Sequence, residues 1–465
     1  MTGKENRQDP GVRRAGYPNE KKSAGPAAAR DTAGARRYIR DRYSPGRLGG
    51  GGAAGIKNVL VIQSASRSGS SFLYRLLSGL PGVLSLNGED IVFHKLNGIA
   101  PVSSSADSDA VPAGFDPGPA VLGRVAEDIL LDAGRVRSGD GPFSAQNYAA
   151  DCAQRFLLQW PGAGADPDLL YGCAAAAVYE WRGAPAFETQ LVWASFLKLL
   201  AGRGVAVNPW YYDLRPEFVR RLFPGSEPLS CPPPGGGLED PPFVVPEPRS
   251  FPGAAGGETL LLKSSSNCYR AGFLKKLFPA ARFRFVRLSR NPMAAISGLM
   301  DGWLSRGFFS RDLAGIAELD IKGYSVPEKP WTRSWWKFDL PPGWAEYRGK
   351  ALPEVCAFQW LSANRSIFAD ASAGLLGKTI GVRYEDLLEP VALGRELERI
   401  REFAGLPEGG SDAARRAAPV MAVTNPRPHK WLKRKDELLP FCSSREVAEI
   451  SSELGYDLKS AELLP

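Results

Sequence analysis

A short polar segment between two apolar stretches offers groups that bind anions. Residues 66–71 read Ser-Arg-Ser-Gly-Ser-Ser and supply four hydroxyls, one glycine and the guanidinium of Arg67. Arginine presents a rigid fork of N–H donors that fits phosphate or sulfate oxygens. The glycine lets the backbone approach an anion closely. On this segment alone, an ordinary capped turn is an equally good interpretation.

A second polar cluster lies further along the chain. Arg287 and Arg290 come at the end of the stretch 282–289, and Ser297 follows one to two helical turns later. Arginine and hydroxyl groups again match the oxygens of an anion. Two such clusters predict a ligand that carries two separated anionic groups.

Both clusters follow predicted strands. Apolar stretches of strand length are found at 58–63, 258–264, 282–289 and 378–384. Each is accompanied by a stretch with helical periodicity. This alternation predicts an α/β fold with a parallel central sheet flanked by helices on both faces. Ligands of such sheets bind at the carboxyl ends of the strands, which is where the polar clusters fall.

The chain between the first two of these strands is long. The expected irregular segments are 101–160 and 227–257, and the expected helices are 186–204 and 215–225. We therefore expect a single domain over 56–465 that carries an insertion at about 101–257. Because a fold does not set the substrate, this insertion is where substrate specificity is expected.

The positive charge is concentrated at the N-terminus. Residues 1–55 hold twelve Lys or Arg against five Asp or Glu, which is +7 of the total net charge of +8. Without apolar periodicity, this segment is expected to be a disordered basic tail and not an arm that binds nucleic acid. No apolar stretch is long enough to predict a membrane span. Six scattered cysteines without a CxxC pair favour a reducing cytoplasm and argue against a metal site.

The familiar nucleotide-binding fingerprints are absent. Neither GxxxxGK[ST] nor GxGxxG occurs, so the segment 66–71 is neither a nucleotide P-loop nor a Rossmann turn. One function that the sequence leaves open is that of a P-loop-like kinase of a small molecule, although the lysine and hydroxyl pair that such kinases need is missing. A nucleotide-binding protein without catalysis is the other alternative.

The sequence resembles the PAPS-dependent sulfotransferases, in particular the tyrosylprotein and carbohydrate type and the bacterial small-molecule enzymes. PAPS is 3′-phosphoadenosine 5′-phosphosulfate. The stretch "SRSGSSFL" is similar to the loop that binds the 5′-phosphosulfate in this family. The resemblance implies a P-loop-like sulfotransferase fold, PAPS as co-substrate and no metal. The loop residues that it implies are Arg67, Ser68, Gly69, Ser70, Ser71 and Phe72.

Three further motifs extend the resemblance over 56–95 and 258–460. "RNPMAAIS" is similar to the 3′-phosphate motif and implies Arg290 and Ser297, although the family usually has one residue more between them. "IGVRYEDLLEP" implies Tyr384 near the nucleotide. "PHKWLKRKDELLP" resembles the C-terminal segment that closes over PAPS and implies Lys430.

The resemblance also implies catalytic groups. "LLLKSSS" places Lys263 near the sulfuryl group, but Ser265 stands where many cytosolic members have a histidine base. The base must then come from elsewhere. "GEDIVFH" offers Glu89, Asp90 and His94, of which we favour Glu89 and place His94 second. The alternatives are that Glu89 only caps a turn or pairs with an arginine, and that His94 is structural.

The expected reaction is an in-line attack of an acceptor hydroxyl on sulfur. We expect a small hydroxylated metabolite, lipid or natural product as acceptor. The aromatic stretch 332–344, with Trp335, Trp336 and Trp344, is expected to form either a wall or lid of the acceptor pocket or a loop packed on the body.

Overall fold

The computed structural model describes residues 26–45, 52–99, 108–136, 143–182, 187–228, 230–250, 258–409, 429–442 and 444–458. Its centre is a five-stranded sheet in the order β2-β5-β1-β6-β9, in which every neighbouring pair is parallel. The strands are β1 (Asn58–Gln63), β2 (Val83–Ser85), β5 (Thr259–Lys263), β6 (Arg282–Ser289) and β9 (Lys378–Arg383). The predicted α/β fold is therefore confirmed, with β2 as a strand that the sequence did not indicate.

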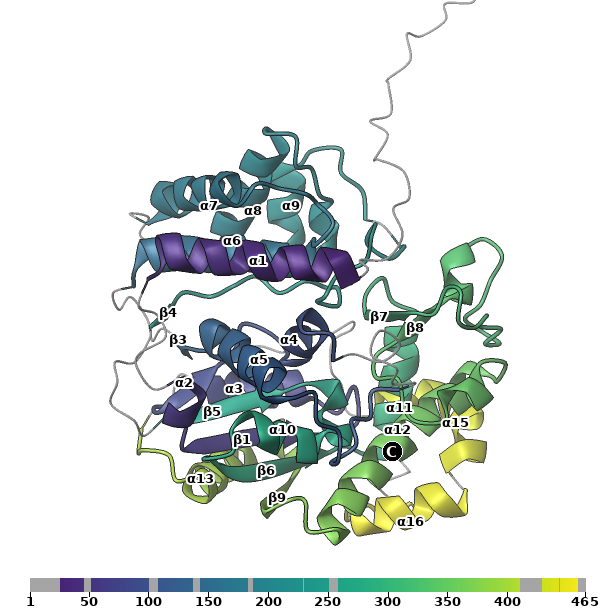
Figure 1. The fold of residues 1–465 in the computed structure, drawn as a ribbon. Coiled ribbons are helices and arrows are strands. Elements are labelled where there is room, and N and C mark those ends of the chain that lie inside the picture. The colour runs from purple at the N-terminus through teal and green to yellow at the C-terminus, as the bar shows by residue number, and fades with distance from the viewer. Residues whose placement is uncertain are drawn as a thin grey trace, which may run out of the picture.

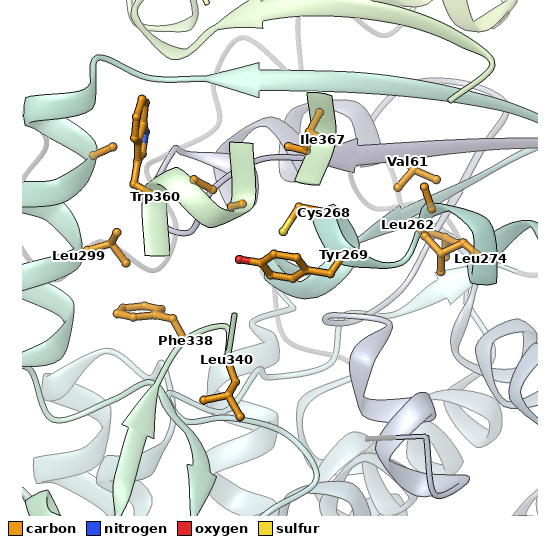
Figure 2. Packing of buried hydrophobic residues seen from close by; sticks show 14 of the residues in the cluster. Val61, Leu262, Cys268, Tyr269, Leu274, Leu299, Phe338, Leu340, Trp360 and Ile367 are labelled. Atoms are coloured by element: carbon orange, nitrogen blue, oxygen red, sulfur yellow. The ribbon is translucent and has the colours of Figure 1, made fainter. Parts of the chain in front are cut away.

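Alternate side chains of β1 enter two different cores. Val59 and Val61 join the larger core, and Leu60 and Ile62 join the core on the opposite face of the sheet. Because both faces are covered, these four residues are almost fully buried and the strand reads as a continuous apolar stretch. Figure 2 shows Val61 in the larger core.

Helices cover both faces of the sheet. The larger core includes side chains from α4 (Ile91–Leu96), α5 (Pro119–Asp132), α10 (Ala271–Leu277), α11 (Pro292–Trp303) and α12 (Leu352–Ser372). The opposite core is closed by α3 (Ser70–Ser78) and α13 (Pro390–Ala404). The C-terminal helices α15 (Lys435–Cys442) and α16 (Arg445–Glu453) lie beside α12 in Figure 1.

A separate helical layer lies above the sheet (Figure 1). It consists of α1 (Pro26–Tyr43), α6 (Ala145–Gln159), α7 (Pro167–Trp181), α8 (Thr189–Ala201) and α9 (Pro216–Leu222). These helices share a core of their own, to which Phe156, Trp193 and Phe196 contribute. The predicted helices at 186–204 and 215–225 are confirmed. The expectation of irregular structure over 101–160 was wrong for α5 and α6.

Part of the expected disordered tail is folded. Residues 26–43 form α1, and Ile39 is fully buried in the core of the helical layer. The Arg36 guanidinium pairs with Asp128 of α5 at 2.6 Å, and the rings of Tyr43 and Tyr171 stack. The prediction failed because it weighed charge, whereas α1 is held by a few apolar and paired side chains. Residues 1–25 lie outside the described residues.

The remaining elements are short. Two small antiparallel sheets pair β3 (Arg135–Val136) with β4 (Arg249–Ser250) and β7 (Phe309–Asp312) with β8 (Trp335–Lys337). The short helices are α2 (Gly52–Gly55), η1 (Pro209–Tyr211), η2 (Ser265–Tyr269), η3 (Pro330–Arg333), η4 (Trp344–Tyr347), η5 (Tyr384–Leu387) and η6 (Lys430–Arg434). Among the described residues, none of the helices has the length and apolar character needed to cross a membrane.

Candidate functional site

A cavity of about 190 Å³ lies at the carboxyl ends of the strands. The register of the sheet places Ile62 beside Lys263 and Gln63 beside Arg287, so β1, β5 and β6 end together. Most of the expected site residues line this cavity: Arg67, Gly69, Ser70, Ser71, Phe72, Glu89, Lys263, Arg290, Ser297, Tyr384 and Lys430. Ser68 and His94 do not line it.

The segment between β1 and α3 has the backbone of an anion cradle. Gly69 precedes α3 with φ of 93°, and Arg67 has φ of 66°. A Cβ atom at Gly69 would lie 2.1 Å from the Cδ2 atom of Tyr384, so only glycine fits against this ring. The first N–H groups of α3 face the turn without partners in their own helix, which is the arrangement that binds anions.

Two arginines meet beside this turn. Arg290, just after β6, donates from Nη1 to the backbone carbonyl oxygen of Arg67 at 2.9 Å. Its guanidinium lies 4.9 Å from the ring centre of Tyr384. Burial, followed by the nearby charge of Arg290, lowers the pKa of Arg67 to about 10. At neutral pH both arginines therefore stay positively charged in a largely buried place, which favours binding of an anionic ligand.

Lys263 and Glu89 form an ion pair inside the cavity. The Nζ atom of Lys263 donates to the Glu89 carboxylate and, at 3.0 Å, to Oγ of Ser71. The second Glu89 oxygen accepts from the backbone N–H of Ser265 at 3.4 Å. The Lys263 side chain is 9% exposed and that of Glu89 is 34% exposed. An acid and a cation are thus held together next to the first turn of α3.

An acidic residue that the sequence analysis missed organises the far end of the cavity. Asp301 of α11 accepts from Lys430 at 2.8 Å and from Arg434 at 2.7 Å. Arg434 also donates to the backbone oxygen and to Oγ of Ser297. Asp301 follows Ser297 by four residues on the predicted helix, which is the signal that could have identified it.

His94 lies outside the cavity lining. Its ring is fully buried, and Nδ1 lies 2.9 Å from Arg270. Burial, reinforced by Arg270, holds the pKa of His94 well below its usual value. Asp90 is also fully buried, and its Oδ1 accepts from Asn267. Both therefore belong to the packing behind the cavity, and of the three expected bases only Glu89 faces it.

A buried carboxylate supports the anion cradle from behind. Asp339 accepts from the Ser66 hydroxyl at 2.5 Å and from the Tyr269 hydroxyl at 2.9 Å. Burial raises the pKa of Asp339 to about 6. Nothing in the sequence motifs pointed to this residue, because it lies 273 positions from Ser66.

The aromatic stretch 332–344 divides between core and cavity. Trp336 and Trp344 are buried in the larger core, which matches the expected loop packed on the body. None of its tryptophans lines the cavity, whereas Phe338 does, together with Phe308. One ring of the stretch, Phe338, therefore lines the cavity, and the tryptophans do not.

The chain has no match among family models or curated proteins. Two solved structures are similar to it. One is a sulfotransferase domain from the curacin biosynthetic pathway, with 14% identity and a TM-score of 0.34 over 87% of this chain and 99% of that domain. The other is a sulfotransferase domain from the Synechococcus PCC 7002 olefin synthase, with 14% identity and a TM-score of 0.33 over 86% and 97%. These TM-scores are too low to assign a function.

Proposed function

We propose that this chain is a PAPS-dependent sulfotransferase with a P-loop-like fold that transfers the sulfuryl group to an acceptor hydroxyl. The observation that carries the proposal is the Lys263–Glu89 ion pair, held against Ser71 at the start of α3. It puts an acid, a cation and an anion-binding helix terminus at one point. This set matches a reaction in which an anion is held and a hydroxyl is deprotonated.

The donor is assigned to the cationic end of the cavity. The 5′-phosphosulfate would lie on the turn that contains Arg67 and Gly69, and the 3′-phosphate would lie near Arg290 and Ser297. The cavity contains both groups of residues, as a ligand with two separated anions requires. Tyr384 would form one side of the nucleotide site, since its ring already packs against Gly69 and Arg290.

The reaction then balances without a further reagent. The acceptor oxygen forms a bond to sulfur, and the bond between sulfur and the bridging oxygen of the 5′-phosphate breaks. The electron pair of that bond leaves with 3′-phosphoadenosine 5′-phosphate (PAP), and the acceptor proton passes to the Glu89 carboxylate. Lys263 and Arg67 would stabilise the charge that develops on the bridging oxygen, as preorganised donors do.

The first experiment measures the melting temperature with PAP, with ATP plus Mg²⁺ and with NAD, each alone. A ligand that binds the folded state raises this temperature. We expect a shift with PAP only. A larger shift with ATP and Mg²⁺, or none with PAP, would favour the kinase alternative and overturn the proposal.

Two variants separate catalysis from binding alone. Lys263→Ala and Glu89→Gln are expected to bind PAP within a few-fold of the wild type but to lose turnover of PAPS. Glu346→Gln, in a short surface helix outside the cavity, is the control that should keep both. Turnover that survives in both variants would contradict the catalytic roles of Lys263 and Glu89. A wild type that binds PAP but shows no turnover would support the non-catalytic alternative.

A further inference from the structure

One wall of the cavity is formed by two stacked phenylalanines. The rings of Phe308 and Phe338 are parallel to within 26°, with centres 4.8 Å apart, and both line the cavity. Phe338 also lies near Leu299 of α11 (Figure 2). The Arg67 guanidinium lies 5.1 Å from the ring centre of Phe308. The aromatic wall therefore begins directly beside the anion cradle.

Both phenylalanines have a backbone conformation that bulky residues rarely adopt. Each has φ of 63°, in the left-handed region. Within the described residues, the other non-glycine positions with positive φ are Arg67, which lines the cavity, and His429, which precedes the cavity residue Lys430. Such conformations are unfavourable and concentrate at ligand sites.

Close packing holds the two rings in place. A Cβ atom at Gly302 would lie 2.2 Å from Cζ of Phe338, so this glycine makes room for the ring. Gly307 likewise allows Pro242 to approach, because its Cβ would lie 2.7 Å from the Pro242 Cδ. The wall thus packs residues next to the β7–β8 sheet against Pro242.

Four aliphatic residues also line the cavity. Ile91 and Val92 come from α4, and Pro242 and Val244 come from the insertion. These last two residues belong to 101–257, where we expect specificity to lie. An apolar part of a ligand placed here would exchange water for aliphatic and aromatic surface, which favours its binding.

The carboxylates that line the cavity already have cationic partners. Asp240 accepts from Lys95 at 2.7 Å, and Glu239 pairs with Arg155 at 2.8 Å. Glu89 pairs with Lys263. A charged acceptor would therefore lose its hydration without gaining an uncommitted counter-charge from these groups, which is costly in a closed site.

From these lining residues we infer that the acceptor is an uncharged apolar alcohol or phenol, held in contact with Phe308, Phe338 and the four aliphatic residues. The inference rests on the proposed function, because it takes the cationic end of the cavity as the donor site. The hydroxyl of this acceptor would point to Glu89, next to the sulfuryl group on the Arg67 turn.

Acceptor binding can be measured without turnover. The full chain is first saturated with PAP and is then titrated in a calorimeter with one compound at a time. The compounds are 2-naphthol, cationic tyramine, anionic 4-hydroxybenzoate and the sugar glucose. We expect 2-naphthol to bind at least tenfold more tightly than the cationic, anionic and sugar compounds. If any of these three binds as tightly as 2-naphthol or more tightly, the inference is overturned. PAP binding is measured first, and if PAP binds, the donor assignment still holds in that case. Failure to bind PAP would instead overturn the proposed function.

A matched pair of variants tests the wall itself. Val244 lines the cavity and Val245 does not, although both are half-buried. The isosteric change Val244→Thr adds a hydroxyl to the wall and should weaken 2-naphthol binding about three- to tenfold, with PAP affinity unchanged. Val245→Thr should leave both affinities unchanged. Equal effects of the two substitutions, or no effect of Val244→Thr, would contradict the assigned wall.

Discussion

The Arg290 guanidinium is bonded to the backbone of Arg67, from Nη1 to the carbonyl oxygen at 2.9 Å. The end of β6 is thereby tied to the turn that follows β1. Arg67 has φ of 66°, a conformation that needs support from its surroundings. Arg290 therefore has two roles in the proposed site, as a cation for the ligand and as a brace for the anion cradle.

The first prediction separates the charge of Arg290 from its shape. Arg290→Lys keeps the positive charge but loses the fork of donors that binds the Arg67 carbonyl and a phosphate together. We expect PAP to bind at least tenfold more weakly, since a hydrogen bond to a charged group contributes about 1.5–3 kcal/mol. Titration calorimetry measures this. Arg284→Lys, on β6 but outside the cavity, is the control, and an equal loss there would refute the role of Arg290.

The second prediction concerns the contact between Gly69 and Tyr384. Gly69→Ala must displace the Tyr384 ring, because the new Cβ would lie 2.1 Å from it, and PAP affinity should fall at least tenfold. Gly98→Ala is the matched control: Gly98 also has positive φ, of 76°, but has open space around it. Both variants should lose roughly 1 kcal/mol of stability through backbone strain. If both retain PAP affinity, the turn at Gly69 does not bind the donor.

The sequence identified several residues that line the cavity, but it did not identify the contacts that hold them in place. Residues 66–71 and Arg290 were identified because they follow apolar strands, and parallel strands end at a common edge. The ion pair of Lys263 with Glu89 could not be read from the chain, since the two residues are 174 positions apart. Asp339 was missed for the same reason: its hydrogen bonds to Ser66 and Tyr269 exist only in the folded state.

The errors also have physical causes. Strands β1 and β6 were predicted with the bounds that the structure has. For β1 the reason is that a strand buried on both faces is a continuous apolar stretch. Helix α5 was overlooked since glycine and aspartate around it resemble loop composition. Helix α1 was overlooked because its charge suggested disorder, although Ile39 and Arg36 are buried in the fold.

The third prediction concerns the C-terminal segment. Asp301 holds Lys430 and Arg434 by hydrogen bonds of 2.8 Å and 2.7 Å. Asp301→Asn removes the charge that anchors them, so tryptic cleavage after Lys433 and Arg434 should become several-fold faster. Time-resolved proteolysis followed by mass spectrometry measures the rate. Asp320→Asn, at an exposed position, should leave it unchanged, and the same rate in all three proteins would show that Asp301 does not anchor the segment.

The fourth prediction is a pH dependence of stability. Burial raises the pKa of Asp339 to about 6, above its unfolded value of 3.8. Between these values the folded state binds more protons at Asp339, so the contribution of Asp339 to stability falls as the pH rises from 4 to 6, by roughly 2–3 kcal/mol. The melting temperature of the wild type minus that of Asp339→Asn should therefore decrease over this range. A difference that stays constant would contradict the assigned pKa.

Asp301 provides a control of opposite sign for that experiment. Burial alone would raise its pKa, but hydrogen bonds and charge from Lys430 and Arg434 outweigh burial and lower it. The unfolded state then binds more protons, so the contribution of Asp301 to stability is present above pH 4 and is lost as the pH falls. The melting temperature of the wild type minus that of Asp301→Asn should increase with pH.

The last prediction tests whether α1 is part of the fold. Arg36 of α1 has a side chain only 3% exposed, pairs with Asp128 at 2.6 Å and lies 5.3 Å from the ring centre of Phe93. Arg36→Ala leaves Asp128 without this partner in a largely buried place, so the free energy of unfolding should fall by about 3 kcal/mol. Arg37→Ala removes the same charge from the exposed neighbouring position and should change it by less than about 0.5 kcal/mol. Urea unfolding measures both values, and equal small effects would mean that α1 is not packed on the body in solution.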